Sequence, residues 1–96
     1  MIYSLIIQSE AVSDLKEAFE WYELKKPGLG FEFIDEVEEV YARLCEHPLN
    51  YSAIKQHFRK IKIHRFPYLV IYEMEDSKII ITAITHIKRE TRPNPQ

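Results

Sequence analysis

The stretch that decides the fold is residues 58–85, FRKIKIHRFPYLVIYEMEDSKIIITAIT. Residues 58–65 alternate between polar and apolar side chains, which predicts a strand with one buried face. Phe66-Pro67 marks a turn, and residues 68–74 form a denser apolar run. Residues 79–85 are almost entirely β-branched or small, as in a strand that is covered on both faces or central in a sheet. We therefore expect three consecutive strands that pair antiparallel.

Upstream of these strands the apolar residues follow a helical period. From Ser9 to Lys26 they recur at spacings of three and four, and Pro27-Gly28 ends the pattern. A second helix follows almost at once and ends at His47-Pro48. Its apolar stripe comprises Phe33 or Ile34, Val37, Val40, Tyr41, Leu44 and Cys45. The connection of four residues forces the two helices into a hairpin.

Residues 3–7 form a short β-branched and aromatic run, which predicts one more strand. The element order is then β-α-α-β-β-β. It predicts an α+β fold in which the helical hairpin packs on a mainly antiparallel four-stranded sheet. A length of 96 residues fits a single domain over 1–96, with an irregular, proline-containing tail at about 90–96.

Composition is ordinary for a folded protein, with 46% hydrophobic and 29% charged residues. The single cysteine, Cys45, excludes an intramolecular disulfide and is expected to be a small core residue. No apolar run reaches the length needed to span a bilayer, and the first residues lack the basic region of a signal peptide. These features predict a cytoplasmic protein with no membrane partner.

The net charge of −2 is divided unevenly along the chain. Residues 1–50 hold 4 Lys or Arg against 11 Asp or Glu, whereas residues 51–96 hold 9 against 4. Two solvated faces would explain this division. Alternatively, the second half presents positive potential to an anionic partner, either nucleic acid or an acidic protein segment.

Several kinds of site are not indicated. Four histidines and one cysteine show no metal-ligand spacing, so neither a metal nor another cofactor is expected. There is no glycine-rich phosphate loop and no nucleophile-elbow motif. Trp21 and Tyr22 are expected to pack in the core or the helical hairpin.

Five short motifs, in order and at matching spacing, resemble the RelE/ParE family of toxins from type II toxin–antitoxin systems. The resemblance runs from about residue 3 to residue 89 and is closer to ParE and to plasmid stabilisation proteins than to RelE. The motifs are Asp14-Leu15 with Ala18 and Trp21-Tyr22-Glu23; Pro27-Gly28-Leu29-Gly30 with Phe33 and Val37; Pro48-Leu49-Asn50-Tyr51; Arg65-Phe66-Pro67-Tyr68 with Val70 and Tyr72; and His86 with Arg89.

For RelE-like members the resemblance implies an endoribonuclease that cuts mRNA in the ribosomal A site, where the 2′-hydroxyl attacks the adjacent phosphate without a metal. Those enzymes carry basic residues on the second and third strands and near the C-terminus, and a late tyrosine. Leu69 stands here in place of the third-strand arginine, and Pro93-Asn94-Pro95 in place of the tyrosine. The catalytic candidates on this reading are Lys60, Lys62, His64 and Arg89, with His64 or His86 as a base.

For ParE-like members the resemblance implies poisoning of DNA gyrase by binding, with no catalytic residue of the toxin. We expect this action because it tolerates both departures. The target-binding candidates are Lys60, Lys62, Lys88, Arg89 and Arg92. Lys60 and Lys62 fit equally well a solvated strand face that protects a sheet edge. A non-toxic protein-binding module on the same fold is the third alternative.

The resemblance also implies a cognate antitoxin and a toxin–antitoxin hetero-oligomer. Such antitoxins wrap the toxin with a partly disordered segment that folds on binding. An amphipathic helix beside the helical hairpin, or a strand added to a sheet edge, would serve. Exposed aromatic side chains would anchor it.

Overall fold

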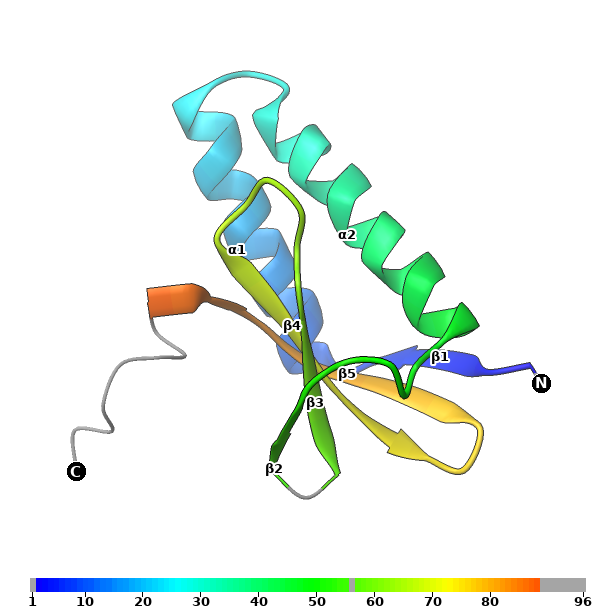
Figure 1. Cartoon of the computed structure of the whole chain (residues 1–96). Coiled ribbons are helices and arrows are strands. Elements are labelled where there is room, and N and C mark those ends of the chain that lie inside the picture. The colour runs from blue at the N-terminus through cyan, green and yellow to red at the C-terminus, as the bar shows by residue number, and fades with distance from the viewer. Residues whose placement is uncertain (1, 56, 89–96) are drawn as a thin grey trace.

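The computed structural model describes residues 2–55 and 57–88, and Figure 1 shows two helices packed against a twisted sheet. The predicted tail at 90–96 lies outside the described residues. The elements are β1 (Ser4–Ile7), α1 (Ser9–Lys25), α2 (Leu29–Glu46), β2 (Ala53–Lys55), β3 (Phe58–Lys62), β4 (Tyr68–Glu75) and β5 (Lys78–His86).

The sheet has five strands in the order β1-β5-β4-β3-β2. β1 pairs parallel with β5, and the other neighbours pair antiparallel. The α+β class is therefore confirmed, but the prediction of four strands was wrong. The missed strand, β2, has three residues, and its register with β3 shifts between Ala53 and Lys55. Such a short, irregular edge strand leaves no period in the sequence.

β3 ends at Lys62, whereas the alternation of polar and apolar residues predicted a strand that continues to Arg65. The chain turns there, and the amide of Ile63 donates to the carbonyl of Tyr68 (2.9 Å). Arg65 adopts a left-handed backbone conformation with φ 75°, which a strand cannot contain. His64 consequently lies in the turn and is exposed.

The core forms where both helices cover one face of the sheet. The stripe predicted for α2 is confirmed, with Phe33, Val37, Val40 and Leu44 all buried and Cys45 partly buried against them. The facing strands contribute residues that are at most 2% exposed, namely Val70, Tyr72, Ile79, Ile81 and Ile84. The apolar side chains of the helices and of the strands thus form one buried layer.

The hairpin between the helices is held by Glu23. Its Oε2 accepts hydrogen bonds from the amides of Gly28 (2.9 Å) and Gly30 (2.8 Å). Gly30 is buried against α1, and a Cβ placed there would lie 2.6 Å from the carbonyl oxygen of Phe19. The close approach of the two helices therefore depends on a residue without a side chain.

The two aromatic neighbours on α1 have different environments. Tyr22 packs against Phe33 and Phe66, with ring centroids 5.4 and 4.9 Å away, as predicted. Trp21 is 54% exposed, so the expectation that it packs in the core or the helical hairpin was wrong. Side chains of consecutive helical residues point about 100° apart around the axis. That rotation carries Trp21 away from α2 and to the rim of a pocket.

Candidate functional site

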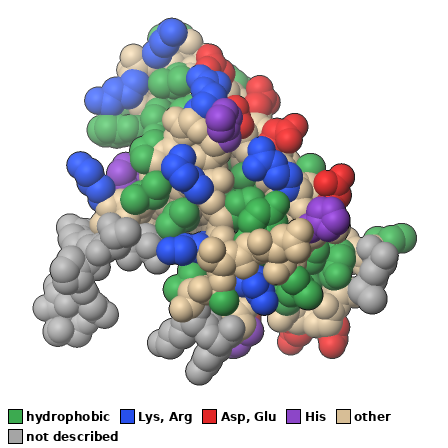
Figure 2. Space-filling model, viewed as in Figure 1, with side chains coloured by type: hydrophobic (Ala, Val, Ile, Leu, Met, Phe, Trp, Pro, Cys, Tyr) green, Lys and Arg blue, Asp and Glu red, His purple; other side chains and the backbone are tan. Residues whose placement is uncertain are grey.

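Two surfaces can contact a target. One is the face of the sheet that the helices leave open, and the other is a pocket between α1 and the sheet. The predicted basic residues divide between these two surfaces. Figure 2 shows Lys and Arg side chains scattered among apolar ones on one face, with acidic side chains gathered along the α2 edge. The Lys and Arg side chains drawn in colour do not form one continuous patch in this view.

Register places Lys60 and Lys62 on the open face. In the β3–β4 pair, Ile61 lies opposite the fully buried Val70, whereas Lys62 lies opposite Leu69. Directly opposite residues in an antiparallel pair project to the same face, and neighbours alternate. Lys60, opposite Ile71, therefore shares the open face with Lys62. The predicted parity of the two lysines is confirmed.

The ammonium group of Lys62 contacts the backbone of its own hairpin. Nζ donates to the carbonyl oxygens of Ile63 (3.0 Å) and Phe66 (3.2 Å), which stabilises the turn between β3 and β4. His64 belongs to that turn and not to the strand, so it does not continue the lysine row. Of the four residues proposed for RNA cleavage, Lys62 therefore contacts the turn with its side chain, and His64 lies within the turn.

Leu69 interrupts the open face at the point where a further cation would lie. It pairs with Lys62 on one side and Thr85 on the other, and it is 8% exposed without belonging to the core beneath the helices. An apolar side chain here provides no charge for a phosphate. Arg89 and Arg92 lie outside the described residues, so their positions stay predictions.

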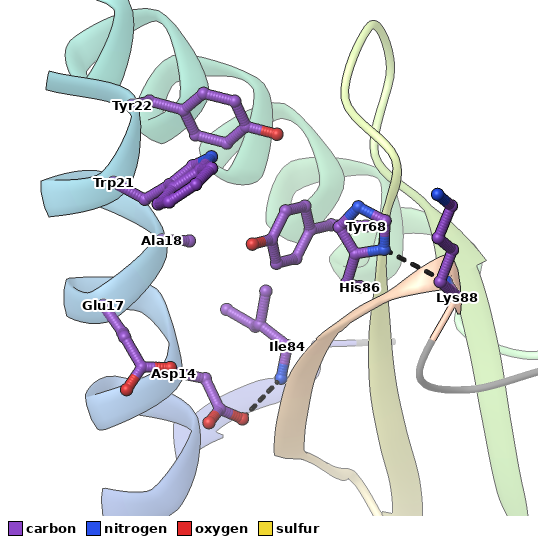
Figure 3. A pocket seen from close by; sticks show the side chains of 9 residues that line it. All are labelled: Asp14, Glu17, Ala18, Trp21, Tyr22, Tyr68, Ile84, His86 and Lys88. Carbon is purple, nitrogen blue, oxygen red and sulfur yellow. Dashed lines mark hydrogen bonds between the residues drawn. The ribbon is translucent and has the colours of Figure 1, made fainter. Parts of the chain in front are cut away.

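The pocket lies beside α1, where β4 begins and β5 ends, and it has a volume of about 520 Å³. Figure 3 shows the side chains that line it. From α1 come Asp14, Glu17, Ala18, Trp21 and Tyr22, which share one helix face because they recur at spacings of three and four. From the strands and the segment after them come Tyr68, Ile84, His86 and Lys88.

Hydrogen bonds and ring contacts fix the pocket walls. Asp14 Oδ2 accepts the backbone N–H of Ile84 (3.0 Å), which joins α1 to β5. His86 Nδ1 accepts the backbone N–H of Lys88 (3.1 Å). Tyr68 meets the His86 ring edge-on, with centroids 5.1 Å apart. Asp14, His86 and the ring of Tyr68 are therefore held in place before any partner binds.

Tyr22 is a hydrogen-bond donor at neutral pH. Burial raises the pKa of its phenol, and the neighbouring Tyr68 raises this pKa further. The hydroxyl therefore keeps its proton well above pH 7.

Lys88 lies apart from the two strand lysines. It lines the pocket together with Tyr68 and Ile84, which lie on the face of the sheet that the helices cover. Of the five predicted target-binding residues, the three that the structure describes therefore do not share one surface, because Lys60 and Lys62 lie on the open face and Lys88 lines the pocket. The spacing of Asp14, Glu17 and Trp21 in the sequence indicates that they share one face of α1, which is the helical wall of the pocket. The sequence did not show which strand residues form the opposite wall.

Metal and membrane sites receive no support from the described residues. Within residues 2–55 and 57–88 no group of three or more His, Cys, Asp or Glu side chains could hold a metal ion. In the same part of the chain neither helix is long and apolar enough to cross a membrane.

The chain combines a helical hairpin, a five-stranded mixed sheet with basic residues on β3, and a pocket beside the first helix. Residues 5–91 match the family described as ParE toxin of type II toxin-antitoxin system, parDE. The chain belongs to this family, and the predicted resemblance is confirmed.

Solved structures agree on the fold. A chain from the structure of the chromosomal ParDE TA system from P. aeruginosa superposes with a TM-score of 0.79 at 17% identity, covering 90% of this chain and 97% of that one. A mutant of the E. coli toxin RelE in the free state gives a TM-score of 0.70 at 16% identity, with coverages of 93% and 87%. The YoeB dimer structure from S. aureus gives 0.62 at 11%, with coverages of 90% and 98%. No curated protein matches this chain.

Proposed function

We propose that this toxin inhibits growth by binding DNA gyrase and that it has no catalytic residue of its own. The observation that carries the proposal is Leu69, an apolar residue between Lys62 and Thr85 on the open face. Cleavage of RNA through its 2′-hydroxyl needs cations around the reacting phosphate, together with a base and an acid. A toxin that acts by binding needs none of these groups.

The contacts of Lys62 support the same proposal. Its ammonium donates two of its three N–H groups to carbonyl oxygens of the hairpin, which holds the side chain against the turn and leaves one N–H for a phosphate. Lys60 remains on the open face as a candidate contact with the target, and Lys88 is a second candidate on the pocket side.

A cognate antitoxin would neutralise this activity in the cytoplasm, where gyrase acts. The family match to parDE toxins supports such a partner, and so does the solved complex of E. coli RelE with an antitoxin peptide, whose toxin has the same fold. We expect the two proteins to form a hetero-oligomer that can be purified after co-expression.

The test compares two assays on purified protein that is free of antitoxin. One measures gyrase supercoiling and cleavage-complex formation, and the other measures mRNA cutting in programmed ribosomes. Inhibited gyrase with intact mRNA is the expected result. Cut mRNA with normal gyrase would overturn the proposal in favour of a ribonuclease built on Lys60. Inactivity in both assays would overturn it in favour of a non-toxic binding module.

Charge removal then identifies the surface that contacts gyrase. Lys60→Met tests the open face and Lys88→Met tests the pocket side. Lys16→Met, on an exposed position of α1, is the matched control. We expect either test variant to raise the concentration needed for half inhibition, whereas the control variant behaves like the original protein. Equal effects of all three would indicate non-specific electrostatics.

A further inference from the structure

The pocket beside α1 combines negative charge with aromatic walls. Asp14 and Glu17 project into it from α1, and Trp21, Tyr22 and Tyr68 surround the space above them. Lys88 adds one positive charge at the end of β5. The described lining holds two carboxylates against one ammonium, an excess of one formal negative charge. This combination favours a cationic ligand over an anionic one.

The pocket also presents acceptors that the fold does not use. The Glu17 side chain and the hydroxyls of Tyr22 and Tyr68 make no hydrogen bond to any described residue. Figure 3 shows the Tyr68 hydroxyl pointing from β4 toward α1, across the space. Asp14 uses Oδ2 for the amide of Ile84, which leaves Oδ1 for a ligand. These acceptors would pair with a ligand that offers several N–H donors in one plane.

The aromatic wall is already a cation acceptor. Lys25, one turn beyond Trp21, holds its ammonium nitrogen 4.3 Å from the indole centroid. Lys25 does not line the pocket, so the ligand space stays open. Among protein cations, a guanidinium is the one that both stacks on aromatic rings and donates in a planar fork to carboxylates.

We propose that this pocket receives an arginine side chain of the antitoxin, held between the carboxylates of Asp14 and Glu17 and the rings of Trp21, Tyr22 and Tyr68. The volume of about 520 Å³ is larger than one side chain, so residues next to the arginine enter as well. An aromatic and arginine contact of this kind is typical of the few residues that carry most of the affinity in an interface. The inference rests on the proposed function only in requiring that an antitoxin exists.

Nucleic acid fits the pocket less well, although aromatic rings stack on bases. Two carboxylates would lie against a phosphate backbone, and among the described lining residues only Lys88 would oppose them. Uncompensated like charges weaken such binding, because phosphate contacts supply most of its affinity. A protein segment with a single basic side chain meets no such repulsion.

The first experiment uses the fluorescence of Trp21, the single tryptophan of the chain. Antitoxin-free protein is titrated with acetyl-arginine amide and, separately, with acetyl-citrulline amide, which has the same shape without the charge. We expect a saturable change at millimolar arginine ligand and at least about a tenfold weaker response to citrulline. Equal responses, or no response to either ligand, would overturn the proposal.

The second experiment measures the antitoxin complex itself. Glu17→Gln removes one carboxylate charge and should weaken antitoxin binding roughly tenfold. Glu20→Gln removes a charge from an exposed position of the same helix that does not line the pocket, and it should leave binding unchanged. In the antitoxin, each arginine is changed to glutamine in turn. One of these changes should weaken binding to the original toxin about as much as Glu17→Gln does. The same change should weaken binding to Glu17→Gln toxin no further.

Failure of this inference is distinguishable from failure of the proposed function. Gyrase inhibition is measured on the unaltered protein without antitoxin, and antitoxin binding is measured separately on Glu17→Gln. If gyrase is inhibited and all arginine changes leave antitoxin binding intact, the pocket proposal is wrong and the toxin proposal stands. If single-stranded RNA changes Trp21 fluorescence and acetyl-arginine amide does not, the pocket is a nucleic-acid site and the proposal is overturned.

Discussion

Asp14 and Ile84 are 70 residues apart in the sequence, and a hydrogen bond of 3.0 Å joins the carboxylate of one to the backbone amide of the other. The bond crosses from α1 to β5 at the wall of the pocket. It fixes how the first helix lies against the sheet, so Asp14 has a structural role as well as a place in the proposed arginine site.

The first prediction follows from that bond. Asp14→Ala leaves the Ile84 amide without its partner in a partly buried position, which should lower the free energy of unfolding by about 1–2 kcal/mol. Asp14→Asn keeps an acceptor oxygen and should restore most of the loss. Ser13→Ala, at the exposed neighbouring position, is the control. Urea unfolding measures all three, and an unchanged midpoint for Asp14→Ala would contradict the prediction.

The second prediction concerns the two glycines of the helical hairpin. An alanine Cβ at Gly30 would lie 2.6 Å from the carbonyl oxygen of Phe19 and 2.7 Å from Cγ of Glu23, whose carboxylate holds the turn. Gly30→Ala should therefore cost about 1–3 kcal/mol through overpacking, a fall of several degrees or more in Tm.

Gly28 provides the matched comparison. It has φ 94°, and a Cβ added there would meet no atom within 4 Å, so only the left-handed backbone opposes a side chain. Gly28→Asn should cost less than Gly30→Ala, because asparagine tolerates this conformation. Thermal unfolding of the two variants is the measurement. A larger loss for Gly28→Asn would mean that the turn and not the helix contact limits the hairpin.

The helices and the central strands could be predicted because each has its own period. The stripe of α2 from Phe33 to Leu44 and the alternation around Ile61 are both visible in the sequence, and both are buried as predicted. Ala53–Lys55 has no such period, since three residues with a shifted register form one edge. The end of β3 was missed for a related reason. The alternation continues to Arg65, although its backbone turns.

The candidate site was harder to predict than the fold. Asp14 and Trp21 were visible as part of a family motif, but Trp21 was expected to pack in the core or the helical hairpin and is 54% exposed. Its pocket needs Tyr68 and His86, which lie far from α1 in the sequence. Only the antiparallel register, which sets Tyr68 opposite His86, brings them together beneath α1. Spacing along one element cannot supply that pairing.

The third prediction compares two tyrosines whose hydroxyl groups are buried. The hydroxyl of Tyr72 donates to the carbonyl oxygen of Pro48, whereas that of Tyr41 is buried without a partner among the described residues. Tyr72→Phe should lower the free energy of unfolding by about 1 kcal/mol because a hydrogen bond is lost. Tyr41→Phe should leave it unchanged or raise it, because a desolvated hydroxyl is removed. Urea midpoints of the two variants measure the difference, and an equal fall in both would contradict the prediction.

High pH gives an independent check on the same pair. Burial raises the pKa of Tyr41 to about 12, and burial likewise raises the pKa of Tyr72 to about 12, from an ordinary value of 10.0. A raised pKa means that the folded state loses its proton later than the unfolded state, so stability falls as pH rises from 10.0 toward 12. Each Tyr→Phe variant should lose less stability than the original protein over this range. If a variant and the original protein lose stability equally over this range, the raised pKa of that tyrosine is contradicted.

The fourth prediction concerns Arg65, whose Nη2 donates to Oε1 of Glu32 (2.7 Å) and thereby links the β3–β4 turn to α2. The hydrogen bond from Arg65 lowers the pKa of Glu32. A lowered pKa contributes stability above the unfolded value, and this contribution is lost as pH falls through the folded one. Glu32→Gln should therefore be less stable than the original protein at neutral pH, and the difference should disappear once the solution is acidic enough to protonate Glu32.

Both groups of this pair are exposed to solvent, so the difference at neutral pH should be small and should shrink in high salt. Glu38→Gln, at an exposed position of α2, is the control for general charge effects. Urea midpoints at neutral and acidic pH measure the prediction. If Glu32→Gln and Glu38→Gln respond alike, the link between the turn and the helix contributes no specific stability. If only Glu32→Gln loses its difference on acidification, the ion pair holds the turn that carries His64 against α2.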